Sequence, residues 1–144
     1  MFKHLLTLVR GKSVDASQSF LDANAVALLR QQMREAAEGV ARSRKAVAVV
    51  MAYAEREKRS LTSIENKIAE LETRALDALS KDREDLAHAA AQAIADLEAE
   101  QEATRKTIET YDGEITVLRR DLKKSEAQLA ELKRGQRLAE ATAK

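Results

Sequence analysis

One pair of side chains in this sequence has a spacing that suits metal chemistry. Asp85 and His88 stand three residues apart, so a helix would present a carboxylate and an imidazole on one face, as in di-iron helical bundles. Such a centre also needs a second copy of the pair and further acids facing it. The only other histidine is His4. We therefore expect no metal ion.

The remaining side chains form no recognisable catalytic set. The sequence contains no glycine-rich phosphate loop, no zinc-ligand spacing and no pairing of a nucleophile with a base. The absence of Cys excludes disulfides and thiolate metal sites and is consistent with a reducing cytoplasm. We expect a protein that is not an enzyme and that carries no cofactor.

The composition is typical of long helices and coiled coils. The 144 residues include no Pro and only four Gly, while 34% are charged and 3% aromatic. The net charge of +1 does not indicate a nucleic-acid partner. The longest stretch without Asp, Glu, Lys or Arg, residues 86–95, is about half the length of a membrane-spanning helix. The N-terminus also lacks the apolar run and cleavage site of a signal peptide.

A heptad pattern runs through the first half of the chain. Its positions alternate in steps of three and four, and fourteen of the sixteen are apolar, which a helix produces when one side faces a partner. Ser43 and Glu57 are the exceptions, and Glu57 is either a rim residue or a buried functional charge. Gly39 is expected to allow close packing. The positions of this seam are Val26, Leu29, Met33, Ala36, Val40, Ser43, Val47, Val50, Ala54, Glu57, Leu61, Ile64, Ile68, Leu71, Ala75 and Ala78.

A second heptad pattern follows it. Between Ala90 and Gln101 it contains one four-residue step too many, a stutter that locally unwinds a left-handed supercoil. Asp112-Gly113 would be a turn signal elsewhere, but the seam continues past it, so the helix is expected to continue. The positions of this seam are Leu86, Ala90, Ala93 or Ile94, Leu97, Gln101, Thr104, Ile108, Tyr111, Ile115, Leu118, Leu122, Ser125, Leu129, Leu132, Gln136 and Ala139.

The chain is expected to reverse between the two patterns, and a kink without reversal is the alternative. Asp82 is predicted to be the N-cap of the second helix, with Glu84 and Asp85 at its positive end. The fold class is all-α: a long antiparallel coiled-coil hairpin, with helices at about 25–80 and 83–141 and facing residue numbers that sum to about 165. The predicted tip comprises Ser80, Lys81, Asp82, Arg83, Glu84 and Asp85.

Residues 1–22 differ from the hairpin, which would occupy 23–144. As a helix they carry an apolar stripe flanked by positive charge, the pattern of a segment that lies in a membrane interface. The stripe could instead pack on the hairpin or on a neighbouring subunit, or the segment could fray. A break is expected at residues 22–24. The predicted membrane-binding residues are Phe2, Lys3, Leu5, Leu6, Val9, Arg10 and Lys12.

Charge is distributed unevenly along the hairpin. Residues 30–59 hold eight basic and four acidic side chains, whereas residues 82–102 hold one basic and seven acidic. Both stretches could simply be solvated faces. They could also dock between molecules, and a seam rich in Ala leaves apolar side chains such as Leu76 and Leu79 uncovered. We expect a homo-oligomer whose self-association residues are Arg42, Arg44, Lys45, Glu84 and Asp85.

The tip resembles that of the bacterial phage-shock protein A family, which includes the plastid vesicle-inducing protein and is related to the ESCRT-III membrane-remodelling proteins. The matching residues are Ala75-Leu76, Leu79-Ser80-Lys81 and Arg83-Glu84-Asp85-Leu86-Ala87, and residues 71–81 are similar to a paralogous branch. The resemblance covers essentially the whole chain. Ala23 stands where the family often has Pro, and the family usually continues through further helices that complete its polymers.

The resemblance implies a non-enzymatic, cytoplasmic protein that docks on the inner face of the cytoplasmic membrane under envelope stress. It implies binding to anionic lipids, assembly into rods or rings, and maintenance or remodelling of the bilayer. A second function that it implies is restraint of an AAA+ transcriptional activator through the hairpin. A purely structural coiled-coil spacer is the third alternative.

Overall fold

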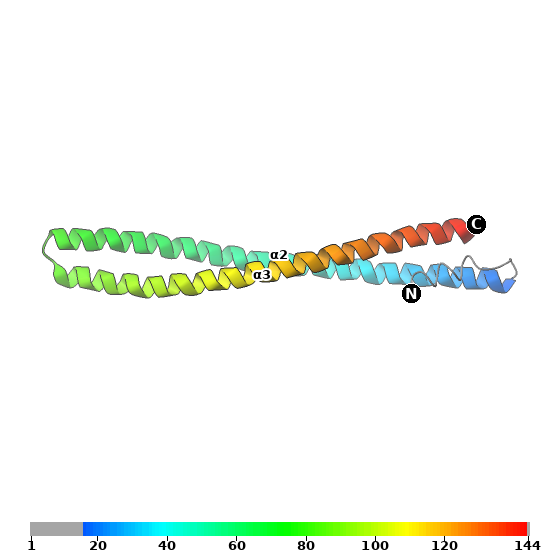
Figure 1. Cartoon of the computed structure of the whole chain (residues 1–144), viewed down its shortest axis with the longest axis horizontal. Coiled ribbons are helices and arrows are strands. Elements are labelled where there is room, and N and C mark those ends of the chain that lie inside the picture. Colours follow the sequence, from blue (N-terminus) through cyan, green and yellow to red (C-terminus); the bar gives the residue numbers. More distant parts are fainter. Residues whose placement is uncertain (1–15, 144) are drawn as a thin grey trace. The chain divides into compact units, whose positions relative to one another are not determined.

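The computed structural model describes the backbone of residues 16–143 and the side chains of residues 23–142. Within these residues lie two helices, α2 (Ala16–Ser80) and α3 (Glu84–Ala143), joined by a turn at residues 81–83 (Figure 1). Contacts such as the ion pair between Arg30 and Glu140 show that α3 returns antiparallel to α2. The predicted all-α hairpin is therefore confirmed, and a kink without reversal is not the explanation of the tip.

The start of α2 differs from the prediction. The helix begins at Ala16 and passes through residues 22–24, where a break was expected. Asp and Asn favour helix caps, but in a helix interior each is only a few tenths of a kcal/mol worse than the good helix formers, and no Pro or Gly reinforces the signal here. The predicted membrane-binding residues lie outside the described residues, so their role stays a prediction.

The chain divides into two compact units. Residues 47–117, which include the turn, form what we call the tip unit. Residues 1–46 and 118–144 form what we call the terminal unit. The described part of each unit is a pair of helical segments, one from α2 and one from α3.

The predicted seam of α2 is confirmed at every position. All sixteen side chains are buried or partly buried. In the terminal unit Leu29 is 1% exposed and Val40 is also buried, and in the tip unit Ile64 is 3% exposed. Glu57 is partly buried. Within each unit the apolar row of α2 therefore lies at the contact between the helices, as the heptad spacing requires.

The predicted seam of α3 is confirmed at every position except the first. Leu86 remains 50% exposed. It occupies the first turn of α3 and lines an open groove with Ala78 of α2 and Ala90 of α3, so one side of it faces solvent. Ala93 and Ile94 are both partly buried, as expected where a stutter shifts the seam from one position to the next.

The register of the tip unit also agrees with the prediction. Tyr53 of α2 lies beside Tyr111 of α3, with 6.1 Å between the ring centroids. The guanidinium of Arg56 lies 5.4 Å from the centroid of the Tyr53 ring, within the range of a cation–π contact. An ion pair of 3.7 Å between Lys58 Nζ and Asp112 Oδ1 also joins the two helices. Aromatic and charged contacts thus flank the apolar seam and fix its alignment.

Neither Gly39 nor Gly113 is a site of close packing. A Cβ atom on Gly39 would meet the Arg42 guanidinium at 3.8 Å, an ordinary contact, so the close packing expected there is absent. A Cβ atom on Gly113 would meet nothing within 4 Å. As predicted, α3 continues through Asp112-Gly113.

Candidate interaction sites

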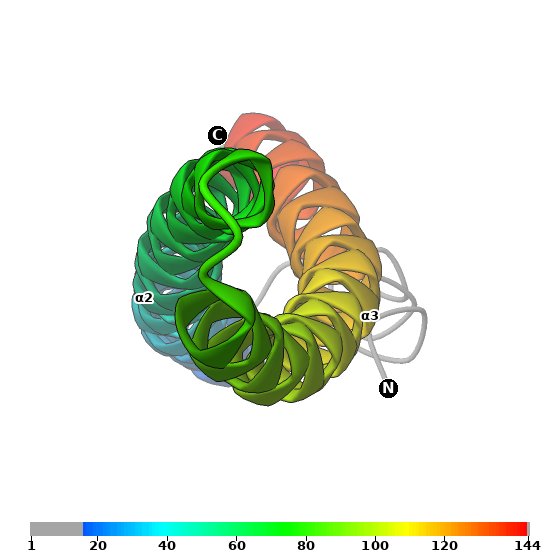
Figure 2. The same ribbon diagram turned by 90° about the vertical axis from the view of Figure 1, so that its left-hand side faces the viewer.

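The turn at the tip is built by a left-handed residue at the end of α2. Asp82 has a φ of 56°, and its N–H donates to the Leu79 carbonyl at 3.2 Å. The next N–H, that of Arg83, donates to the Ala78 carbonyl at 2.8 Å. These two bonds form a Schellman motif, which satisfies carbonyls at a helix C-terminus and reverses the chain (Figure 2).

Asp82 is therefore not the N-cap of α3, as the sequence analysis predicted. The Arg83 carbonyl accepts the first helical bond, from Ala87 N–H at 3.1 Å, so Arg83 occupies the N-cap position. An N-cap residue takes an extended backbone, which the left-handed φ of Asp82 rules out. Asp suits both positions, because its short polar side chain tolerates the left-handed region better than most residues do. The geometry that closes the turn places Asp82 at the C-terminal end of α2.

Short side-chain contacts hold the tip residues in place. Ser80 Oγ donates to the Asp77 carbonyl at 2.7 Å, and Lys81 Nζ lies 3.2 Å from Asp77 Oδ2. Arg83 Nε lies 3.3 Å from Asp85 Oδ1. This guanidinium lowers the pKa of Asp85 below its ordinary value, and a hydrogen bond from the Leu86 N–H acts in the same direction. Glu84 makes no ion pair within the described residues and remains available to a partner.

Three leucines near the turn are exposed to solvent. Leu76 is 69% exposed, Leu79 54% and Leu86 50%, and we call them the tip leucines. The sequence analysis predicted that Leu76 and Leu79 would be uncovered, and this is confirmed. Leu76 and Leu79 stand three residues apart on α2, whereas Leu86 begins α3 and lines an open groove between the two helices. Exposed apolar side chains on a surface commonly mark a site where another molecule binds. The tip therefore combines exposed apolar area with acidic side chains.

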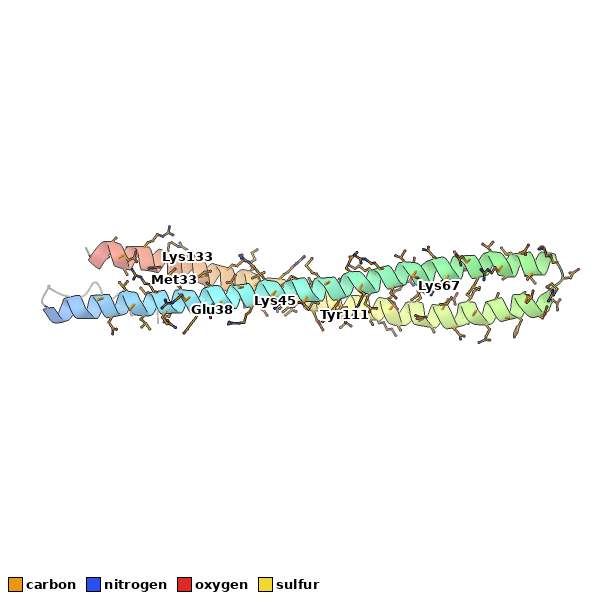
Figure 3. All side chains as sticks on the ribbon, turned by 180° about the vertical axis from the view of Figure 1, so that it is seen from behind. Met33, Glu38, Lys45, Lys67, Tyr111 and Lys133 are labelled. Carbon is orange, nitrogen blue, oxygen red and sulfur yellow. The ribbon has the colours of Figure 1, made fainter. Side chains whose placement is uncertain are left out.

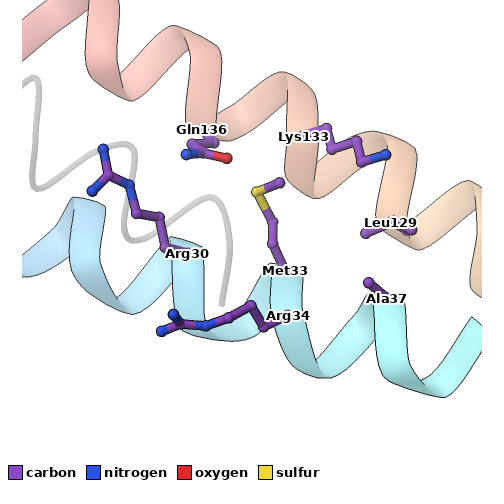
Figure 4. A pocket seen from close by; sticks show the side chains of 7 residues that line it. All are labelled: Arg30, Met33, Arg34, Ala37, Leu129, Lys133 and Gln136. Atoms are coloured by element: carbon purple, nitrogen blue, oxygen red, sulfur yellow. The ribbon is translucent and has the colours of Figure 1, made fainter.

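The terminal unit carries an open groove of about 350 Å³ between α2 and α3 (Figure 4). Met33 points from α2 towards α3, and Ala37 and Leu129 face each other beside it. These apolar side chains form the floor. The polar side chains that complete the lining, which we call the rim, are Arg30, Arg34, Lys133 and Gln136.

The cations of the rim differ in how far they are already neutralised. Arg30 Nη2 lies 3.2 Å from Glu140 Oε1, and the amide of Gln136 donates to the same oxygen at 2.9 Å. Arg34 Nη2 donates to the amide oxygen of Gln31 at 2.9 Å, which leaves its charge in place. Lys133, seen on α3 in Figure 3, makes no ion pair with any described residue. Two positive charges at the rim are thus uncompensated within the described part of the chain.

Sequence reasoning did not find this groove. Met33 and Leu129 were assigned to the seam. Arg30 and Arg34 were counted in the basic stretch 30–59, for which a solvated face and a docking surface both stayed open, and Lys133 was not singled out. The groove arises because two segments distant in the sequence meet with an Ala at position 37 between larger side chains. Small residues that face a seam position of the other helix were the one feature of the sequence that could have indicated the groove.

The predicted self-association residues fall into two groups. Arg44 Nη2 already lies 3.7 Å from Glu126 Oε1, and Asp85 is held by Arg83. Lys45 projects from α2 without an ion pair among the described residues (Figure 3). Arg42 lines a second, more polar groove of the terminal unit, beside Asp121 and Ser125.

The described residues gather no group of three potential metal ligands, and His88 is exposed. Within the same residues, neither helix carries an apolar stretch that is long enough to cross a bilayer. The surfaces that stand out are the apolar, acidic tip and the cationic groove. Fold and surfaces together define an antiparallel coiled-coil hairpin protein.

The model of the PspA/IM30 family matches residues 1–144, and the chain belongs to this family. The resemblance noted at the tip is confirmed. Members of the family are membrane-associated coiled-coil proteins of the stress response. Comparisons with curated proteins and with solved structures gave no match.

Proposed function

We propose that this chain is a non-enzymatic protein that binds the inner face of the cytoplasmic membrane, assembles with copies of itself, and maintains or remodels the bilayer under envelope stress. The observation that carries the proposal is the family match, which spans the chain from residue 1 and so includes the amphipathic N-terminal segment. The exposed apolar side chains of the hairpin support the assembly step.

The membrane contact is assigned to residues 1–22. Burying Phe2, Leu5, Leu6 and Val9 at about 1.5–3 kcal/mol each gives an upper bound of about 6–12 kcal/mol. Ordering of the segment removes much of this gain. Each of the three basic side chains adds about 1 kcal/mol near an anionic surface. The expected result is weak, salt-sensitive binding that requires anionic lipid.

Flotation with vesicles tests this assignment. The full chain should float with vesicles rich in phosphatidylglycerol at low salt, and much less with phosphatidylcholine alone or at high salt. Leu5→Gln should weaken flotation strongly because it interrupts the predicted stripe. Leu8→Gln makes the same chemical change off the stripe and should have little effect. If the chain without residues 1–22 floats as well as the full chain, the segment is not the membrane contact.

Assembly is attributed to opposite charges together with exposed apolar side chains. Arg42 and Lys45 make no ion pair among the described residues, which suits them to contacts with acidic side chains of another copy. Individual surface ion pairs contribute about 0–1 kcal/mol, so their effect requires repetition over many subunits.

The alternatives give different results in the same experiments. Inhibition of an AAA+ activator's ATPase without vesicle binding would favour the regulatory function. Failure of both vesicle binding and ATPase inhibition would favour a structural spacer.

A further inference from the structure

We propose that the tip leucines of one molecule dock in the groove of the terminal unit of a second copy. The inference rests on the proposed self-association and names the two surfaces that meet. Leu76, Leu79 and Leu86 supply the apolar side chains, and Met33, Ala37 and Leu129 supply the surface that receives them.

The apolar parts of the two surfaces are suited to each other. Leu76 and Leu79 stand three residues apart on α2 and therefore project from one side of the helix. The groove is open to solvent, and its volume of about 350 Å³ is larger than a leucine side chain. Docking removes both exposed apolar surfaces from water at once.

The charges of the two units favour the same contact. The tip unit has nine Lys and Arg against sixteen Asp and Glu, a net charge of −7. The terminal unit has sixteen Lys and Arg against eight Asp and Glu, a net charge of +8. At the contact itself, the unpaired Glu84 would meet the uncompensated Lys133 and Arg34 of the rim. Long-range attraction brings the copies together, and the leucines hold them.

The other candidate occupants of the groove fit less well. The N-terminal segment carries Lys3, Arg10 and Lys12, which would be repelled by the cationic rim. An anionic lipid would satisfy the rim, but it would leave the tip leucines uncovered.

This contact joins two different surfaces, so it is not self-complementary. Each molecule still offers a tip after its groove is filled, and a groove after its tip is bound. Repetition of such a contact yields open chains or rings, not closed dimers. Assembly should therefore grow with concentration without stopping at two copies.

Charge reversal and apolar truncation test the contact in the full chain. Lys133→Glu at the rim and the double variant Leu76→Gln, Leu79→Gln at the tip should each raise the concentration for half-assembly about tenfold or more, measured by light scattering and sedimentation velocity. Glu84→Lys should restore part of the assembly of Lys133→Glu. Matched controls are Lys124→Glu, an exposed cation of the terminal unit outside the groove, and Val117→Gln, an exposed apolar residue far along α3 from the turn. Circular dichroism checks that every variant is folded.

Crosslinking identifies the contacting residues directly, because the sequence contains no Cys. A copy with Leu79→Cys mixed with a size-tagged copy with Ala37→Cys should form mixed disulfides, and Val117→Cys with Ala37→Cys should not. Equal losses of assembly in Lys133→Glu and Lys124→Glu would overturn the proposal. Unchanged assembly of the double leucine variant would also overturn it. So would a Lys133→Glu protein that assembles normally but loses vesicle binding, since the groove would then hold lipid. If these assembly tests fail while the full chain still floats with vesicles, the proposed membrane function is retained and only this contact between copies is wrong.

Discussion

The tip unit and the terminal unit have the same heptad seam but very different surfaces. Seven of the nine large apolar side chains that are exposed among the described residues belong to the tip unit. The tip unit is also net acidic, and the terminal unit is net basic. The seam forms the hairpin in both units, so the residues beside the seam are what distinguish their interactions.

The flanking positions show how this difference arises. In the tip unit, Leu76 and Leu79 each follow a seam position directly, so they lie at the edge of the contact with α3 and stay exposed. In the terminal unit the same kind of position, directly after Met33, is occupied by Arg34. Arg34 is exposed, and a cation at such an edge position keeps its charged head in water. One unit thus offers apolar side chains where the other offers cations.

The largest effect is expected from the core of the terminal unit. Leu29→Ala should lower the free energy of unfolding by about 2–5 kcal/mol, because Leu29 is 1% exposed and truncation leaves a cavity. Leu28→Ala removes the same atoms from a side chain that is 46% exposed and should cost less than about 1 kcal/mol. Chemical denaturation measures both. If both substitutions lowered the free energy of unfolding equally, the seam would not run through Leu29.

The turn of the tip unit should respond next most strongly. Asp82→Gly should stabilise the chain by about 1 kcal/mol, because Gly adopts the left-handed backbone without strain. Asp82→Val should destabilise it by about 1–2 kcal/mol. Asp77→Gly, inside α2, should be destabilising, as Gly normally is within a helix. Thermal unfolding distinguishes the three, and a destabilising Asp82→Gly would contradict the Schellman turn.

The helix glycines give a smaller comparison between the units. Gly113→Ala in the tip unit should stabilise by about 0.5–1 kcal/mol, since the added methyl group meets open space. Gly39→Ala in the terminal unit should gain a similar amount, because its methyl group makes only an ordinary contact with Arg42. A loss of stability from Gly39→Ala, seen by denaturation, would show the close packing first expected at this position.

The smallest effect concerns pH. The lowered pKa of Asp85 means that its carboxylate stabilises the fold at neutral pH, and this contribution is lost as the pH falls through the folded-state pKa. Arg83→Gln should raise the pKa of Asp85 towards its ordinary value, because it removes the largest cause of the shift. NMR titration of the Asp85 carboxyl measures this. An unchanged pKa would show that Arg83 does not contact Asp85 in solution.

The sequence by itself determined the helices and the seam. Apolar residues at heptad spacing can face a partner only along one line, so Leu29, Val40 and Ile64 were assigned to the contact from their spacing alone. The register followed from the place of the reversal. The exposure of Leu76 and Leu79 followed as well, because a two-helix contact has a single seam and these residues stand beside it.

Only the tertiary structure decided the points where local preferences were nearly balanced. Asp82 suits either helix end, and closing the turn selected the left-handed position. Asp22 and Asn24 cost a continuing helix little, so no break occurs at residues 22–24. The exposure of Leu86 and the groove at Met33 depend on which side chains of the other helix stand opposite. Spacing along one helix does not contain that information, because it arises only when two distant segments pack against each other.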